Sequence, residues 1–428
     1  MKLRFYNGKV LTMEEKMEIF SGEVWTEDAL ITYCGPEKEI SSETFDKEID
    51  LQGNLILPGF KNAHTHSAMT FLRSHADDLP LSEWLHKKVF PMEALLTAED
   101  IYTLSKLGIA EYLTSGITAN FDMYVNSDAI AKASVDTGFR TVIVSGLNNF
   151  VSSLEELEDC YKKYNDFHPL ISFCLGFHAE YTTSEDLLRG VAKISKKYQA
   201  PVYTHNSETA GEVAECLKRY HSTPTTFLDS LGMFEYGGGG YHCVYLSDED
   251  MDIFQKKNLS VVTNPSSNLK LASGIAPVEK YLEKGINLAI GTDGPASNNC
   301  LDMFREMFLV TGLAKVSSKD ARAVDATQVL KAATVGGAKA MGLNAHTLSK
   351  GSLADLTVIN LHKPNMQPLN NIVKNIVYSG SKDNILMTVV NGKILYEKGE
   401  FFIGEDMEAL YEKCNFIIGR IKKDCGIS

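Results

Sequence analysis

The chain has 428 residues, of which 44% are hydrophobic and 23% are charged, so it is a globular protein too large for one small core. Its formal net charge of −13 argues against a nucleic-acid backbone or an anionic membrane surface as its partner. No apolar run reaches the roughly 18 residues of a membrane span and no signal peptide is evident at the N-terminus, so we expect a cytoplasmic protein.

The eight cysteines are scattered and include no Cys-x-x-Cys pair. This pattern argues against a disulfide framework and against a structural zinc site. The zinc signature His-x-Glu followed by Pro-Cys-x-x-Cys is also absent. Any metal site must therefore use histidine and carboxylate ligands.

The two ends of the chain have similar strand-like patterns. Residues 9–13 and 29–33 near the start, and 355–359 and 385–390 near the end, are short apolar runs bounded by turn residues. We therefore expect residues 1–54 and 346–428, the latter with a closing helix, to form one small β-sandwich around a central domain at residues 55–345.

The central domain alternates between strand-like and helical patterns. Apolar residues recur three or four apart at 100–115 and 184–198, which predicts helices there. Eight β-then-α units in this length favour an α/β fold of the (β/α)8 barrel type over an open doubly wound sheet. The predicted strands are residues 55–57, 117–121, 140–144, 170–175, 201–204, 240–244, 259–263 and 286–290.

Residues that can carry chemistry follow the predicted strands. In a (β/α)8 barrel the active site lies at the C-terminal ends of the strands. His64 and His66 are two residues apart after the first strand, and two imidazoles on the same side are half of a tetrahedral metal site. Five of the 11 histidines in the chain fall at strand ends, as does one conspicuous aspartate. These residues are His64, His66, His178, His205, His242 and Asp293.

These motifs together resemble the amidohydrolase superfamily, in its single-metal branch, and most closely the 5′-methylthioadenosine/S-adenosylhomocysteine deaminases. The resemblance spans nearly the whole barrel. It rests on residues 62–66 (Asn-Ala-His-Thr-His), 76–81 (Ala-Asp-Asp-Leu-Pro-Leu) with Trp84 and Glu93, 204–205 (Thr-His) with Glu208, 241–243 (Tyr-His-Cys), 264–274 (Asn-Pro-Ser-Ser-Asn-Leu-Lys-Leu-Ala-Ser-Gly) and 291–294 (Gly-Thr-Asp-Gly).

The resemblance implies a set of roles for the strand-end residues. One divalent metal, with zinc preferred and iron or manganese chemically suitable, is expected on His64, His66, His205 and Asp293. Asp293 would also take a proton from the attacking water, and His242 would hydrogen-bond to the hydroxide or the developing oxyanion. Glu208 would give a proton to the ring nitrogen beside the attacked carbon.

The resemblance also implies substrate contacts and a reaction. Glu93 and His178 match positions that contact the ribose and the purine, Trp84 would form an aromatic wall, and Arg140 matches a substrate-binding arginine. The expected reaction is release of ammonia from the 6-amino group of an adenine nucleoside or thionucleoside. Family members are often dimers or tetramers, so a homo-oligomer is a further expectation.

Two departures from the family pattern bear on the substrate. Ser145 stands where relatives that accept S-adenosylhomocysteine tend to have an arginine, and Glu180 adds a carboxylate near the expected mouth of the site. Both favour a neutral substrate such as 5′-methylthioadenosine, adenosine or 5′-deoxyadenosine, since a carboxylate tail would lose its partner. An alternative is deamination or hydrolysis of another ring, such as guanine, a pterin or a triazine. A binding protein without activity is disfavoured because no ligand residue is missing.

Overall fold

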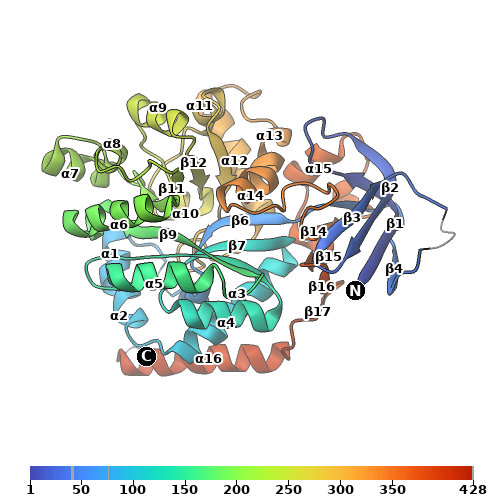
Figure 1. Cartoon of the computed structure of the whole chain (residues 1–428), viewed down its shortest axis with the longest axis horizontal. Helices are drawn as coiled ribbons and strands as arrows, with labels where there is room; N and C mark the ends of the chain where they lie inside the picture. The colour runs from blue at the N-terminus through green and yellow to red at the C-terminus, as the bar shows by residue number, and fades with distance from the viewer. Residues whose placement is uncertain (40–42, 76, 427–428) are drawn as a thin grey trace.

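The computed structural model describes residues 1–39, 43–75 and 77–426, which form two β-sheets with surrounding helices (Figure 1). Ala76, the first residue of the motif at 76–81, lies outside these described residues. Within them, no helix is long and apolar enough to cross a membrane.

The larger body is a barrel of eight parallel strands, which confirms the predicted (β/α)8 fold. Its strands are almost fully buried, as expected for a parallel sheet covered by helices. The last strand leads back to the first, because the Asp293 N–H donates to the His64 carbonyl at 3.0 Å. In order around the barrel, the strands are β6 (Phe60–Thr65), β7 (Ile117–Met123), β8 (Arg140–Val144), β9 (Ile171–Ala179), β10 (Val202–Asn206), β11 (Gly238–His242), β12 (Ser260–Thr263) and β13 (Asn287–Ile290).

Helices between the strands surround the barrel, and their ends follow local sequence signals. The side chain of Thr97 accepts from the Asp100 N–H, and Asp100 accepts in return from the Thr97 N–H, so this capping box starts α3. Ser184 caps α6, whose first turn is acidic and whose last turn is basic, as the helix dipole favours. The main helices are α3 (Ala98–Thr114), α4 (Ser127–Thr137), α5 (Leu154–Tyr164), α6 (Glu185–Tyr198), α7 (Ala210–Tyr220), α8 (Pro224–Ser230), α9 (Asp248–Lys256), α10 (Pro265–Lys270), α11 (Val278–Glu283), α12 (Met303–Ser318), α13 (Ala326–Lys331) and α14 (Gly337–Ala340).

The two chain ends together build the second sheet, on the right of Figure 1. It is a single mixed sheet of nine strands, and side chains such as Phe5, Val24 and Val389 share one core cluster. Both ends of the chain therefore contribute to one domain, as predicted, and the strands of that domain form one continuous sheet. Its strands are β1 (Lys2–Leu11), β2 (Ile19–Glu27), β3 (Leu30–Gly35), β4 (Lys47–Asp50), β5 (Leu55–Pro58), β14 (Leu356–Ile359), β15 (Ile385–Val390), β16 (Lys393–Glu397) and β17 (Glu400–Phe401).

One strand predicted for the barrel belongs to this sheet instead. Residues 55–57 form β5, which pairs with β1 and β14. The barrel strand that carries His64 is the next one, β6, and Gly59 separates the two strands. The interpretation of residues 55–57 was wrong because two apolar strands follow each other with one glycine between them, and apolar character alone does not assign a strand to a sheet.

The C-terminal helix α16 (Met407–Asp424) lies along the barrel and not against the nine-stranded sheet, as its red ribbon in Figure 1 makes clear. Arg420 forms an ion pair with Asp100 of α3, and Glu405 pairs with Lys106 of the same helix. The shorter helix α15 (Ile372–Tyr378) packs near α12 and α13. Helices α15 and α16, which lie before and after the last three strands of the nine-stranded sheet, therefore pack on the outside of the barrel.

Candidate metal centre and active site

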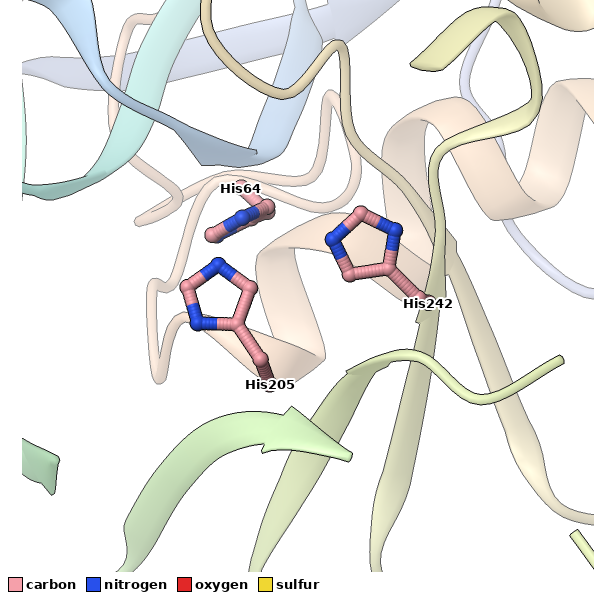
Figure 2. Close-up of side chains that lie close together, drawn as sticks. All are labelled: His64, His205 and His242. Atoms are coloured by element: carbon pink, nitrogen blue, oxygen red, sulfur yellow. The ribbon is translucent and has the colours of Figure 1, made fainter. Parts of the chain in front are cut away.

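Imidazoles from three strands converge at the C-terminal end of the barrel. The ring of His64, from β6, lies 4.8 Å from the ring of His205, from β10, and 5.7 Å from that of His242, from β11. Figure 2 shows these three rings turned toward a common space. His66 follows β6, and its ring lies 4.9 Å from that of His64.

Asp293, just after β13, completes this group. Its Oδ1 lies 3.2 Å from His66 Nε2 and 3.7 Å from His64 Nε2. The carboxylate is oriented by the Gly294 N–H, which donates to Oδ1 at 2.7 Å, and by the Ser267 hydroxyl, which donates to Oδ2 at 2.5 Å. Both oxygens of Asp293 are therefore held in place beside the imidazoles.

Hydrogen bonds at the Nδ1 atoms turn the Nε2 atoms of three histidines toward the space they share with Asp293. His205 Nδ1 donates to the His178 carbonyl at 2.7 Å, and His66 Nδ1 donates to the Met123 carbonyl. His242 Nδ1 donates to the side-chain oxygen of Asn268 at 2.7 Å. Such bonds fix the proton on Nδ1 and present the Nε2 lone pair to a ligand.

His64 is the strongest sign that a cation belongs here. Both of its ring nitrogens are buried and have no hydrogen-bond partner among the described residues, which is rare and costly without an ion or water. Two groups of possible ligand atoms meet at His64, one with His205 and His242 and the other with His66 and Asp293. Imidazole nitrogens and a carboxylate oxygen are the donors that zinc prefers, so these residues fit a divalent metal.

The charge states of the group agree with this fit. Burial lowers the pKa values of His64 and His205, so both are neutral. Burial opposes ionisation of Asp293, but the hydrogen bond to His66 and the neighbouring imidazoles outweigh it and hold its pKa well below the usual range. The same bond raises the pKa of His66 although burial lowers it. A metal cation would take the place of the proton that His66 and Asp293 share.

Glu208 lies at the edge of the same group. It follows β10 by two residues, and its Oε2 is 3.9 Å from His242 Nε2. Burial raises the pKa of its carboxyl, while a hydrogen bond from the Ser273 hydroxyl, at 3.2 Å, opposes that rise. A carboxyl group with a raised pKa is suited to donate a proton.

A pocket opens above the metal-binding group, and the residues expected to contact substrate line it. Trp84, Glu93 and His178 all lie in its wall. Glu93 accepts a hydrogen bond from the Tyr124 hydroxyl at 2.6 Å, and the buried indole N–H of Trp84 has no acceptor within the part of the chain that the structure describes. Burial lowers the pKa of His178 to about 4, so its imidazole is neutral.

Arg140 does not lie in this pocket, and its interpretation as a substrate residue was wrong. It is the first residue of β8, so it lies at the opposite end of the barrel from the imidazoles. Its Nε donates to Asp355 Oδ2 at 2.5 Å and its Nη1 donates to the Pro169 carbonyl at 2.9 Å. Arg140 therefore joins the barrel to the nine-stranded sheet.

Glu180 likewise adds no free charge at the mouth of the pocket. Its side chain is 2% exposed and forms an ion pair with Arg219 at 2.6 Å. It stands just after β9 in a short 3-10 turn and is not among the residues that line the pocket. The expectation that Glu180 makes the mouth more negative was wrong, because position after a strand does not fix the direction of a side chain.

The sequence patterns gave no role to several residues that orient the site. Ser267, Asn268 and Ser273 orient Asp293, His242 and Glu208, respectively. All three residues lie in the motif at 264–274, which was a detectable signal. Tyr124, the partner of Glu93, follows β7 and carried no signal beyond being aromatic.

Comparison with known proteins agrees with this geometry. The model of the Amidohydrolase family matches residues 55–395. The chain belongs to the amidohydrolase family. This amidohydrolase is 38% identical over 421 residues to the 5-methylthioadenosine/S-adenosylhomocysteine deaminase of Caldicellulosiruptor saccharolyticus, a match that covers 97% of the chain and 98% of the relative. It is also 38% identical over 415 residues to the 5'-deoxyadenosine deaminase of Methanosarcina mazei, which covers 95% of each chain.

A solved structure of similar fold carries a metal. The amidohydrolase superposes on an adenosine deaminase from Xanthomonas campestris with bound zinc, with a TM-score of 0.92 and 30% sequence identity. The match covers 98% of both chains. The barrel and the nine-stranded sheet are thus both shared with that enzyme.

Proposed function

We propose that this amidohydrolase releases ammonia from the 6-amino group of an adenine nucleoside and that it depends on one divalent metal, with zinc the most suitable. His64, His66, His205 and Asp293 would hold the metal, as their donor atoms and charge states favour. When bound, the metal would lower the pKa of a coordinated water toward about 7 and so make hydroxide available near neutral pH. The names of the similar deaminases and the zinc in the similar structure support this proposal.

The residues around the metal would move the protons. Asp293, a carboxylate held by Ser267 and Gly294, would accept a proton from the attacking water. His242 donates a hydrogen bond from Nδ1 to Asn268, so its Nε2 would accept a hydrogen bond from that water and orient it. The attack forms a C6–O bond on the face of the purine turned toward Asp293.

Glu208 would make the ring electrophilic. Its carboxyl, with a raised pKa, would give a proton to the ring nitrogen next to C6, because an aromatic amidine accepts a nucleophile only when that nitrogen is protonated. One proton of the water returns to the amino group, the C6–N bond breaks and ammonia leaves. The other proton returns to the Glu208 carboxylate, and the product carries a new carbonyl at C6 and a proton on the ring nitrogen. Acid-base help of this kind contributes about 10² to 10⁴ in rate.

The far wall of the pocket favours a nucleoside over a free base. The Glu93 carboxylate, oriented by Tyr124, is a suitable acceptor for ribose hydroxyls, and neutral His178 can hydrogen-bond to the purine. Both residues line one pocket with Glu208. This arrangement supports an adenine nucleoside ahead of guanine, pterins or triazines.

The pocket also favours a neutral substituent at the 5′ position. Among the described residues that line it, the charged side chains are Glu93, Glu208 and Asp293, and none is a lysine or an arginine. The rim residues are largely apolar, and a carboxylate tail would lose its water without gaining a cation. We therefore propose 5′-methylthioadenosine, 5′-deoxyadenosine or adenosine as substrate ahead of S-adenosylhomocysteine.

The observation that carries the proposal is the buried Glu208 carboxyl 3.9 Å from His242 Nε2, which in turn lies 3.8 Å from Asp293, one of the four candidate ligands. The test is ammonia release from adenosine, 5′-methylthioadenosine, 5′-deoxyadenosine, guanine and a pterin, with metal content measured on the same sample. Turnover of the adenine nucleosides with about one bound metal is expected. Turnover of guanine or the pterin alone would refute the proposed substrate class.

A further inference from the structure

Glu212 is a buried carboxyl group on α7 that the proposed chemistry does not use. Its side chain is 7% exposed, and it points back from the helix to the loop that carries Glu208. Its Oε1 accepts from the Ser207 N–H at 3.0 Å, and its Oε2 accepts from the Glu208 N–H at 2.7 Å. Two successive backbone N–H groups thus converge on one carboxylate, as in the anion-binding backbone concavities called nests.

The loop held by Glu212 is in a conformation that it would not keep by itself. Ser207 has a φ of 51°, in the left-handed region that a non-glycine residue rarely adopts. Its carbonyl accepts from the Tyr245 N–H at 2.9 Å on the other side. Hydrogen bonds therefore hold the peptide between Ser207 and Glu208 on both sides, from Tyr245 in the loop after β11 and to Glu212 on α7.

An ordinary helix cap does not account for this contact. Glu212 is the third residue of α7, and the Thr209 hydroxyl already caps the helix by accepting from the Glu212 N–H at 3.1 Å. In a capping box the glutamate would return to the N–H of Thr209 itself. Here it reaches one and two residues further back, to the loop that aims Glu208.

We propose that Glu212 is a positioning residue for Glu208: by binding the two N–H groups it fixes the direction in which Glu208 presents its proton to the purine. This inference rests on the proposed function of Glu208. Removing the Glu212 carboxylate leaves two buried N–H groups without an acceptor and releases the strained peptide. A shift of about 1 Å in a catalytic group costs on the order of 10²-fold in rate, so we expect kcat to fall about 10- to 100-fold with KM little changed.

The test is a double-mutant cycle on the metal-loaded enzyme with the best adenine nucleoside. Glu212→Ala and Glu212→Gln are each measured alone and in a Glu208→Gln background, with kcat, KM, metal content and melting temperature recorded. If Glu212 acts through Glu208, its loss lowers kcat about 10- to 100-fold alone but less than about twofold when Glu208 is already replaced, because the effects of coupled residues do not add. Glu212→Gln, which keeps the shape and one acceptor, should lose less than Glu212→Ala.

Exposed Glu215 on the same helix provides the matched control. Among the described residues its carboxylate forms an ion pair with Lys218 alone, at 3.8 Å, so Glu215→Ala should leave kcat unchanged. An equal loss of kcat in both backgrounds, or a fall in melting temperature with unchanged kcat, would overturn the positioning role alone. If Glu212→Ala fails to fold, Glu212→Gln decides. If Glu208→Gln itself keeps full activity, both the inference and the proposed role of Glu208 are overturned.

Discussion

Placing an arginine at the rim of the pocket should create activity toward a carboxylate tail. Val151 lines the pocket and is 40% exposed, in the loop after β8. In Val151→Arg the guanidinium can reach a tail that extends from the 5′ position toward the mouth. We therefore expect S-adenosylhomocysteine, which we propose to be the less favoured substrate of the native enzyme, to become a better one.

The size of the gain follows from the exposure of the site. Hydrogen bonds to charged groups contribute about 1.5–3 kcal/mol, and the lower part of this range applies because the position is partly open to solvent. A gain of about 1.5–2 kcal/mol corresponds to a rise of about 10- to 30-fold in kcat/KM for S-adenosylhomocysteine. The kcat/KM for 5′-methylthioadenosine, which has no charge on its tail, should stay within about threefold.

The assay is ammonia release from the two substrates under identical conditions. Val151→Gln controls for side-chain length without charge, and Val316→Arg places the same charge on an exposed valine of α12, away from the residues that line the pocket. Neither control should favour S-adenosylhomocysteine. Equal turnover of both substrates by the native enzyme would refute the reasoning, which depends on the lack of a lysine or arginine among the described residues that line the pocket.

Three further substitutions test individual contacts. Glu93→Gln should raise KM for nucleosides while leaving any turnover of free adenine unchanged, and an equal effect on both would remove Glu93 from ribose binding. Ser273→Ala removes a hydrogen bond that lowers the pKa of Glu208; because the protonated acid is the active form, the alkaline limb of the kcat/KM profile should move to higher pH, and a move to lower pH would contradict this. Arg140→Ala breaks the buried pair with Asp355 and should cost about 3–5 kcal/mol of unfolding free energy, seen in denaturant titration, while kcat/KM of the folded enzyme is kept.

The fold and the convergence of the histidines could be predicted from sequence because both depend on periodic signals. Alternating strand and helix patterns define a (β/α)8 barrel, and the barrel brings all C-terminal strand ends together. His64, His205 and Asp293 are far apart in sequence but each follows a strand, so their meeting required no knowledge of side-chain packing.

The errors arose where position along a strand or the direction of a side chain decides the outcome. Arg140 begins its strand instead of ending it, which moves its side chain to the far end of the barrel. Glu180 does follow a strand, but it turns to Arg219. Residues that act through hydrogen bonds, such as Glu212 and Tyr124, depend on distances of about an ångström that no sequence periodicity encodes.

The most direct test of the account is metal-dependent release of ammonia from 5′-methylthioadenosine. The enzyme is stripped with a chelator and titrated with zinc, and Asp293→Asn is treated in the same way. We expect no activity in the stripped enzyme, recovery that is complete near one zinc per chain, and no recovery in Asp293→Asn although it remains folded. Full activity of metal-free protein, or an active Asp293→Asn enzyme, would contradict the proposed centre.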